Sequence, residues 1–104
     1  MTSYQRSAKE IVEKYDLIAD VFPRYADLVS EVGELGKEML KASGYGASEF
    51  IANDELALEF GDVMFSLAAL ANILNVDMDK AFAAAICKYQ KRFEATGQIG
   101  SQEG

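Results

Sequence analysis

The sequence of 104 residues predicts an all-α protein built from four helices. Strand-like alternation of apolar and polar residues is absent, and Pro23 is the single proline. Ala, Leu, Glu and Lys, which all favour helices, dominate the chain, and apolar residues recur at helical spacing. The length allows one small domain, and 50% hydrophobic with 26% charged residues is a globular composition.

The first two helices are predicted over residues 3–19 and from about Pro23 to Ala42. Proline suits the first turn of a helix, and Asp20 precedes it as the candidate cap. The glycine- and serine-rich segment 43–48 then ends the second helix. The first helix has one apolar face, formed by Ala8, Ile11, Val12, Tyr15 and Ile18.

The third helix is predicted from Asn53 or Asp54, either of which can cap it, to about Leu74. After a short turn, Asp77 is placed to cap the fourth helix, which runs to about Ala95. The third helix is apolar nearly all round, which is typical of a buried helix.

We expect a single helical domain over residues 1–96 and a flexible tail, rich in Gly, Ser and Gln, over residues 97–104. The N-terminus lacks the apolar segment of a secretory signal, and the most apolar stretch, residues 63–74, is too short to cross a bilayer. The single cysteine, Cys87, allows no internal disulfide and favours a reducing compartment. These features predict a soluble, cytoplasmic protein.

The chain is acidic, with 10 Lys and Arg against 17 Asp and Glu and a net charge of -7. A nonspecific nucleic-acid binder needs a basic face, and a polybasic membrane anchor needs clustered Lys and Arg, so neither partner is expected. Histidine is absent, which excludes His-based general bases, Ser-His-Asp triads and His-ligated zinc or iron sites. Any catalysis must therefore use carboxylates and Lys or Arg, with or without a hard metal ion.

Two acidic stripes share one spacing, i, i+4, i+7, i+11, which places the members of each stripe on one side of a helix. The stripe of the second helix lies beside its predicted core face of Tyr25, Leu28, Val32, Leu35 and Met39. Its members are Asp27, Glu31, Glu34 and Glu38. The stripe of the third helix consists of Glu55, Glu59, Asp62 and Ser66.

Paired carboxylates such as Glu31 and Glu34 are common on solvated helix faces, and this is the simplest interpretation of the first stripe. Glu59 and Asp62 argue against it, because they lie on a helix with little solvent-facing surface, where carboxylates need partners. If the two helices pack antiparallel, four carboxylates converge and their repulsion requires a cation. An all-oxygen site without His or thiolate ligands favours Mg²⁺, with Mn²⁺ as the alternative.

The fourth helix has a predicted core face of Phe82, Ile86, Tyr89 and Phe93. Lys88, Lys91 and Arg92 cluster on a neighbouring face at i, i+3, i+4. One interpretation is a solvated helix end, where positive charges interact favourably with the helix dipole. The other is a clamp for phosphate, because cations near a metal–carboxylate cluster suit a polyphosphate ligand.

Taken together, these motifs resemble the MazG-like all-α nucleoside triphosphate pyrophosphohydrolases. The resemblance lies in Glu31-Val-Gly-Glu34-Leu, followed after a spacer by Leu58-Glu59-Phe-Gly-Asp62-Val63. These segments match the E-x-x-E and E-x-x-D pattern of the family. The segment from Lys88 to Phe93 is similar to the last helix of the family, which carries Lys and Arg.

The resemblance implies an oligomeric four-helix bundle with helices shared at the interface, as a homodimer or homotetramer. It implies Mg²⁺-dependent cleavage of an NTP or dNTP to the monophosphate and pyrophosphate. A house-cleaning role for this reaction is one expectation. Glu31, Glu34, Glu59 and Asp62 would be the catalytic and metal-binding residues. Lys88 and Arg92, and less directly Lys91, would bind phosphate, while the base pocket is not identified.

Two alternatives stay open at the level of sequence. A noncatalytic helical dimerisation or interaction module would use the surplus of apolar surface for a partner and leave both acidic stripes solvated. The related phosphoribosyl-ATP pyrophosphohydrolases share the carboxylate pattern, but they tend to place a histidine soon after E-x-x-D, and this chain has none. Dependence of stability on Mg²⁺ distinguishes a metal enzyme from an interaction module.

Overall fold

The structure is a computed structural model that describes residues 2–97, in which there are four helices and no strand. The helices are α1 (Ser3–Lys14), α2 (Val21–Ala42), α3 (Asp54–Ile73) and α4 (Met78–Thr96). This confirms the all-α prediction and the four helical segments. The predicted tail over 97–104 lies outside the described residues except for Gly97, which ends α4 in the left-handed conformation.

The helix ends follow local signals in most places. Asn53 caps α3 by accepting a hydrogen bond from the Leu56 N–H, and Asp77 caps α4 through the N–H groups of Asp79 and Lys80. The prediction was wrong for the end of the first helix, which stops at Lys14 instead of residue 19. Asp16 there adopts a positive φ of 49°, a conformation that Asp tolerates better than most residues, and it turns the chain toward α2.

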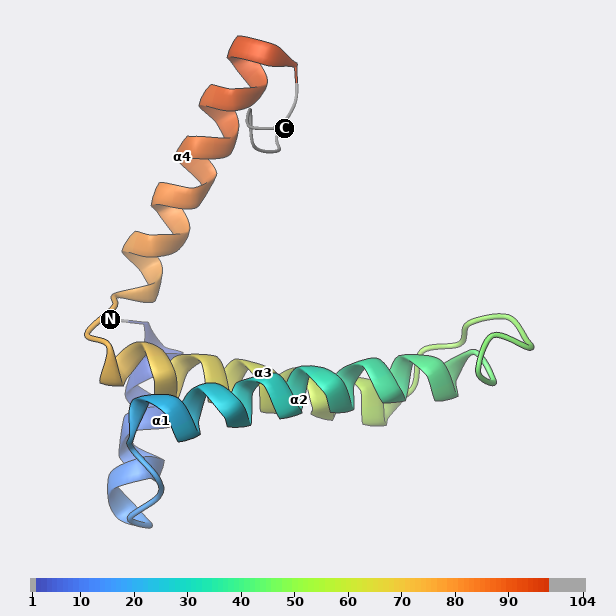
Figure 1. The fold of residues 1–104 in the computed structure, drawn as a ribbon, viewed down its shortest axis with the longest axis horizontal. Coiled ribbons are helices and arrows are strands. Elements are labelled where there is room, and N and C mark those ends of the chain that lie inside the picture. Colours follow the sequence, from blue (N-terminus) through green and yellow to red (C-terminus); the bar gives the residue numbers. More distant parts are fainter. Residues whose placement is uncertain (1, 98–104) are drawn as a thin grey trace.

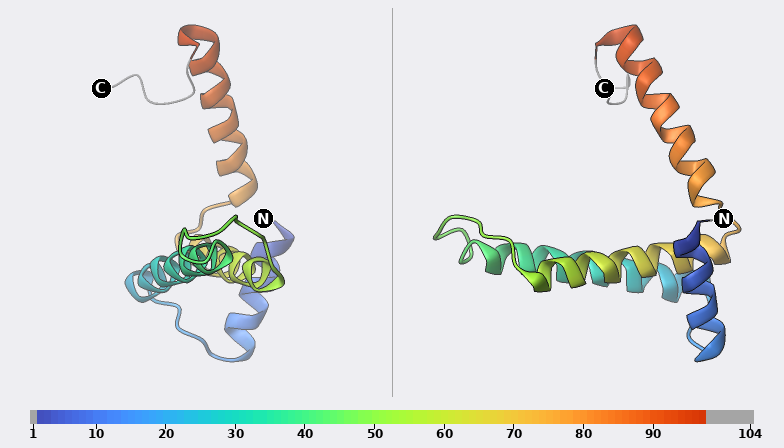
Figure 2. Two further views of the ribbon diagram at one scale, coloured as in Figure 1. Left: turned by 90° about the vertical axis from the view of Figure 1, so that its right-hand side faces the viewer. Right: turned by 180° about the vertical axis from the view of Figure 1, so that it is seen from behind.

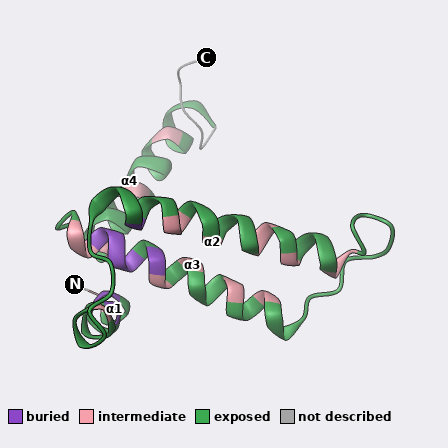
Figure 3. Ribbon diagram, turned by 60° about the horizontal axis from the view of Figure 1, so that its bottom comes forward, coloured by how far each residue is buried: buried purple, intermediate pink, exposed green. Residues whose placement is uncertain are grey.

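α2 and α3 lie side by side and antiparallel, and α1 crosses α3 near its C-terminal end (Figures 1 and 2). The small core lies at this crossing, as Figure 3 shows. Its apolar members are Ala8, Ala68, Ala69, Leu70 and Ala71. Buried Gln5 fixes α1 to the start of α4, since its side-chain amide donates to Val76 O at 2.7 Å and accepts from the Met78 N–H at 2.9 Å.

α4 projects away from the other three helices and has no buried residue (Figure 1). Phe82 is 70% exposed and Phe93 57% exposed, so the predicted core face of this helix is uncovered. The radius of gyration is 16.9 Å, against about 13 Å for a compact chain of this length. Within residues 2–97 of a single chain, α4 therefore stands apart from the α2–α3 pair, and the bundle with helices shared between chains stays a prediction.

α3 is buried only over its C-terminal half, while Leu58 and Phe60 near its N-terminus are exposed. By length and composition alone this helix is long and apolar enough to cross a membrane. The sequence analysis considered only residues 63–74 and so underestimated the length of the apolar segment. The core helix of a soluble protein passes the same test. Here the helix packs on α1 and α2 and carries Glu59 and Asp62 near its middle.

Candidate metal centre

The two acidic stripes face each other across the antiparallel pair of α2 and α3. Their register is marked by the Ser66 hydroxyl, which donates a hydrogen bond to Asp27 Oδ2 at 2.6 Å. One helical turn further along, this register places Glu31 opposite Asp62. Because the two stripes have equal spacing, this register places their members opposite each other in pairs. We call this row of pairs the acidic ladder.

Three carboxylates of this ladder converge. One oxygen each from Glu31, Glu59 and Asp62 lies within 4.8 Å of the other two. Glu31 and Glu59 are half-buried and Asp62 is exposed, so the group lies at the edge of the helix pair, where an ion can reach it from solvent. One ligand would come from α2 and two from α3.

The electrostatics of the cluster are those of crowded negative charge. The pKa of Glu31 is raised above its ordinary value, first because desolvation disfavours the charged form and then because Asp62 and other carboxylates repel it. The pKa of Glu59 is raised for the same reasons, with Asp62 again the strongest neighbouring charge. The charges that shift both groups are all carboxylates, so a cation placed among them would be attracted by every one.

Glu34 is the fourth predicted ligand, and its carboxylate lies outside the group of three. It is exposed on α2, yet its charge contributes to the raised pKa of both Glu31 and Glu59. Glu34 therefore lies at the border of the cluster, within its electrostatic field.

The donor set fits a hard divalent cation. All three side chains offer carboxylate oxygens, which Mg²⁺ and Mn²⁺ prefer, and the exposed side leaves room for water ligands. Within residues 2–97, the ion pairs on this face lie toward the ends of the ladder, where Arg24 pairs with Asp27 and Lys41 with Glu38. Neither pair supplies a positive charge between the three converging carboxylates.

The three predicted phosphate-binding residues lie elsewhere in the chain. Lys88, Lys91 and Arg92 belong to α4, which leaves the α2–α3 pair and points away from it (Figure 1). The Lys88 ammonium lies over the ring of Tyr89, 5.0 Å from its centroid. One chain alone therefore does not bring the basic residues to the carboxylates.

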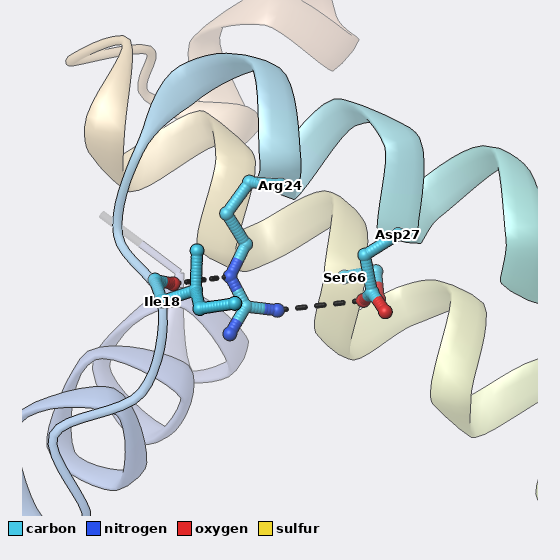
Figure 4. A network of polar contacts seen from close by, with 4 residues as sticks. All are labelled: Ile18, Arg24, Asp27 and Ser66. Atoms are coloured by element: carbon cyan, nitrogen blue, oxygen red, sulfur yellow. Dashed lines mark hydrogen bonds and ion pairs between the residues drawn. The ribbon is translucent and has the colours of Figure 1, made fainter.

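A polar network beside the cluster was missed by the sequence analysis. Arg24 is buried, donates through Nε to Ile18 O at 2.6 Å and through Nη1 to Asp27 Oδ2 at 3.4 Å (Figure 4). Asp27 and Ser66 were placed in the stripes but given no role. The spacing of the two stripes contained the signal for this pair. In an antiparallel arrangement the equal spacing places Ser66 opposite Asp27, where the other positions of the α3 stripe carry carboxylates.

Comparison with known proteins identifies the family. Residues 24–96 match the MazG nucleotide pyrophosphohydrolase domain, a span that includes α3, α4 and all seven predicted site residues. The chain belongs to the MazG nucleotide pyrophosphohydrolase domain family. The resemblance drawn from the E-x-x-E and E-x-x-D motifs is thereby confirmed, and an acidic cluster between α2 and α3 is consistent with the divalent metal site of a MazG domain.

A curated relative matches about half of the chain. The nucleoside triphosphate pyrophosphohydrolase/pyrophosphatase MazG of Thermotoga maritima is 38% identical over 50 residues. The match covers 48% of this chain and 20% of that protein, so the chain corresponds to about a fifth of the relative's length. No solved structure matches the chain significantly.

Proposed function

We propose that this MazG domain is a Mg²⁺-dependent nucleoside triphosphate pyrophosphohydrolase. It would cleave the bond between the α- and β-phosphates of an NTP or dNTP and release the monophosphate and pyrophosphate. The observation that supports this most is the convergence of Glu31, Glu59 and Asp62 from two helices, within the segment that matches the family. The name of the Thermotoga maritima relative supports the same reaction class.

In this proposal Glu31, Glu59 and Asp62 hold the ion and Glu34 borders it. Bound Mg²⁺ supplies charge neutralisation at the phosphates and lowers the pKa of a water molecule. The carboxylates fix the position of that chemistry between α2 and α3, on the exposed edge where a nucleotide can approach. A carboxylate of the cluster accepts the proton of the water that attacks the α-phosphorus.

The uncovered helix α4 supports a homodimer or homotetramer with a shared site. Its apolar face needs a partner, since Phe82 and Phe93 are more than half exposed. α3 carries four acidic residues and no basic one, whereas α4 carries Lys88, Lys91 and Arg92 beside its apolar face. α4 of a second copy would therefore fit the α2–α3 pair in both apolar character and charge, and it would bring the phosphate-binding residues to the carboxylates.

We also propose that the protein is cytoplasmic and binds neither nucleic acid nor membrane. The net charge of -7 opposes binding to polyanions and to anionic lipid surfaces. Nucleoside triphosphates are cytoplasmic metabolites, which agrees with the proposed reaction.

The proposal is tested by measuring pyrophosphate release from a panel of NTPs, dNTPs and modified nucleotides, with and without Mg²⁺. We expect metal-dependent release from at least one nucleotide, and the ranking of bases defines the specificity. Absence of release together with intact metal binding would restrict the substrate to another phosphate compound. Absence of both would favour a noncatalytic interaction module, the function to which the uncovered apolar face of α4 would otherwise point.

Mg²⁺ is expected to stabilise the protein against heat. At ten times its dissociation constant, a ligand of the folded state adds about 1.4 kcal/mol, which is roughly 5–10 °C in melting temperature for a domain of this size. Glu59→Gln, nearly equal in size, should abolish this gain. The same variant should melt slightly higher than the wild type in EDTA, because it removes repulsion from Asp62.

Differential scanning fluorimetry with a Mg²⁺ titration measures both effects. Glu10→Gln on α1, which changes the same residue type outside the cluster, is the matched control and should keep the full Mg²⁺ response. A wild-type melting temperature that does not respond to Mg²⁺ would contradict the metal centre.

A further inference from the structure

The hydrogen bond between Ser66 and Asp27 joins α2 and α3 directly beside the carboxylate cluster. Ser66 is 1% exposed, and its Oγ lies 2.6 Å from Asp27 Oδ2. Buried Arg24 holds the same carboxylate oxygen at 3.4 Å, and its guanidinium carbon lies 5.7 Å from the centroid of the Phe65 ring. Figure 4 shows Arg24, Asp27 and Ser66 of this network, together with Ile18.

The bond lies close enough to the cluster for a change in helix register to separate the metal ligands. Asp27 precedes Glu31 by four residues, and Ser66 follows Asp62 by four residues, so the bond lies about 6 Å, one turn, from the first pair of metal ligands. A slip of one helix by a single residue would move its side chains by about 1.5 Å along the axis and about 100° around it. Such a slip would take Glu31 away from Asp62.

Apolar packing between α2 and α3 is non-directional, so it specifies their register less sharply than a hydrogen bond does. On the other side of the bond, Glu31 is repelled by Asp62, by Asp27 itself and by Glu59. A short, part-buried hydrogen bond from buried Ser66 to a charged acceptor is therefore a directional contact at this end of the cluster.

We infer that Asp27 and Ser66 are positioning residues, which lock the register of α2 against α3 so that Glu31 meets Glu59 and Asp62 around one metal ion. Arg24 donates to the same Asp27 oxygen as Ser66 and so helps to hold that carboxylate in place. This role rests on the metal centre of the proposed function, and it assigns to Asp27 and Ser66 a task that the acidic motifs themselves do not include.

Four single variants distinguish a loss of ligand positioning from a loss of charge and from a loss of folding stability. Ser66→Ala removes the donor without changing charge. Asp27→Ala and Asp27→Asn both remove one negative charge, but Asn keeps an oxygen that can accept from Ser66. Ser30→Ala, on the exposed side of α2 next to Glu31, is the matched control for loss of a serine hydroxyl.

The measurement is the dissociation constant for Mn²⁺ and Mg²⁺, by electron paramagnetic resonance and calorimetry, at least 20 °C below the melting temperature of each variant. We expect Ser66→Ala and Asp27→Ala to weaken binding about tenfold, the lower end for partners that orient metal ligands. Asp27→Asn should stay within about threefold of the wild type, and Ser30→Ala should equal it. The double variant Ser66→Ala/Asp27→Ala should bind no more weakly than the weaker single variant, because one bond is removed in both cases.

The outcomes are decisive for the inference. A Ser66→Ala variant with a lower melting temperature but wild-type metal affinity would overturn it and leave a purely structural bond. A wild type that binds neither metal would overturn it too, since nothing would be positioned. If the ranking of affinities holds while no nucleotide is hydrolysed, the positioning role stands and the proposed reaction fails.

Discussion

Asp62→Asn is expected to lower Mg²⁺-dependent pyrophosphate release about 10³-fold. Asp62 lies in the group of three converging carboxylates and is the strongest charge acting on both Glu31 and Glu59. An amide keeps the size of the side chain but removes the negative charge that would hold a divalent cation in the proposed site. A bound metal supplies several kcal/mol of transition-state stabilisation, and about 4 kcal/mol corresponds to 10³ in rate.

The comparison is made at saturating nucleotide over a wide range of Mg²⁺ concentrations. Glu59→Gln should show the same loss, and Glu10→Gln on α1 should retain wild-type turnover. Circular dichroism and sedimentation would verify that the variants keep their helices and their assembly. Full Mg²⁺-dependent turnover in either Asp62→Asn or Glu59→Gln would refute the assignment of the catalytic centre.

The second large effect concerns the separation of α4 from the carboxylates. If α4 of one copy completes the site of another, two inactive variants should restore activity when they assemble together. The first is Asp62→Asn, and the second is the double variant Lys88→Ala/Arg92→Ala, for which we expect a loss of roughly 10²-fold from the removal of charge-assisted contacts to phosphate. In a mixed dimer, the intact carboxylates of the second variant meet the intact α4 of the first.

Random assembly of equal amounts of the two variants makes about half of the dimers mixed, and each mixed dimer has one intact site of its two. About one quarter of all sites are then intact, so activity should rise to about a quarter of the wild-type value. Coexpression with a different affinity tag on each variant, followed by purification on both tags, isolates the mixed dimers. Their activity should be about half of the wild-type value. A mixture no more active than the average of its two separate variants would show that each site lies within one chain. Sedimentation showing only monomer at micromolar concentration would contradict the shared site as well.

The comparison of sequence and structure is most informative at the acidic ladder. The residue types and their spacing indicated which helix faces would meet and which kind of ion they suit. The spacing did not distinguish Glu34, which lies outside the converging group, from Glu31, which lies in it. That difference depends on the register of α2 and α3, which is a contact between segments far apart in the chain.

The same limit explains the network of Arg24, Asp27 and Ser66. A serine on an apolar helix and an aspartate on an acidic stripe have no evident relation until the two helices are placed together. The bond between them spans 39 residues of sequence, and it exists only because both helices are antiparallel and in one particular register.

The sequence by itself determined the helices, most of their caps and the acidic character of the site, because periodicity, capping and charge act over a few neighbouring residues. Tertiary structure alone decided that three carboxylates converge and that α4 leaves the other helices. An apolar stripe such as that of Phe82 and Phe93 has the same pattern whether it packs within a chain or against another. The free energy of burying apolar surface depends on the area covered and not on which chain covers it.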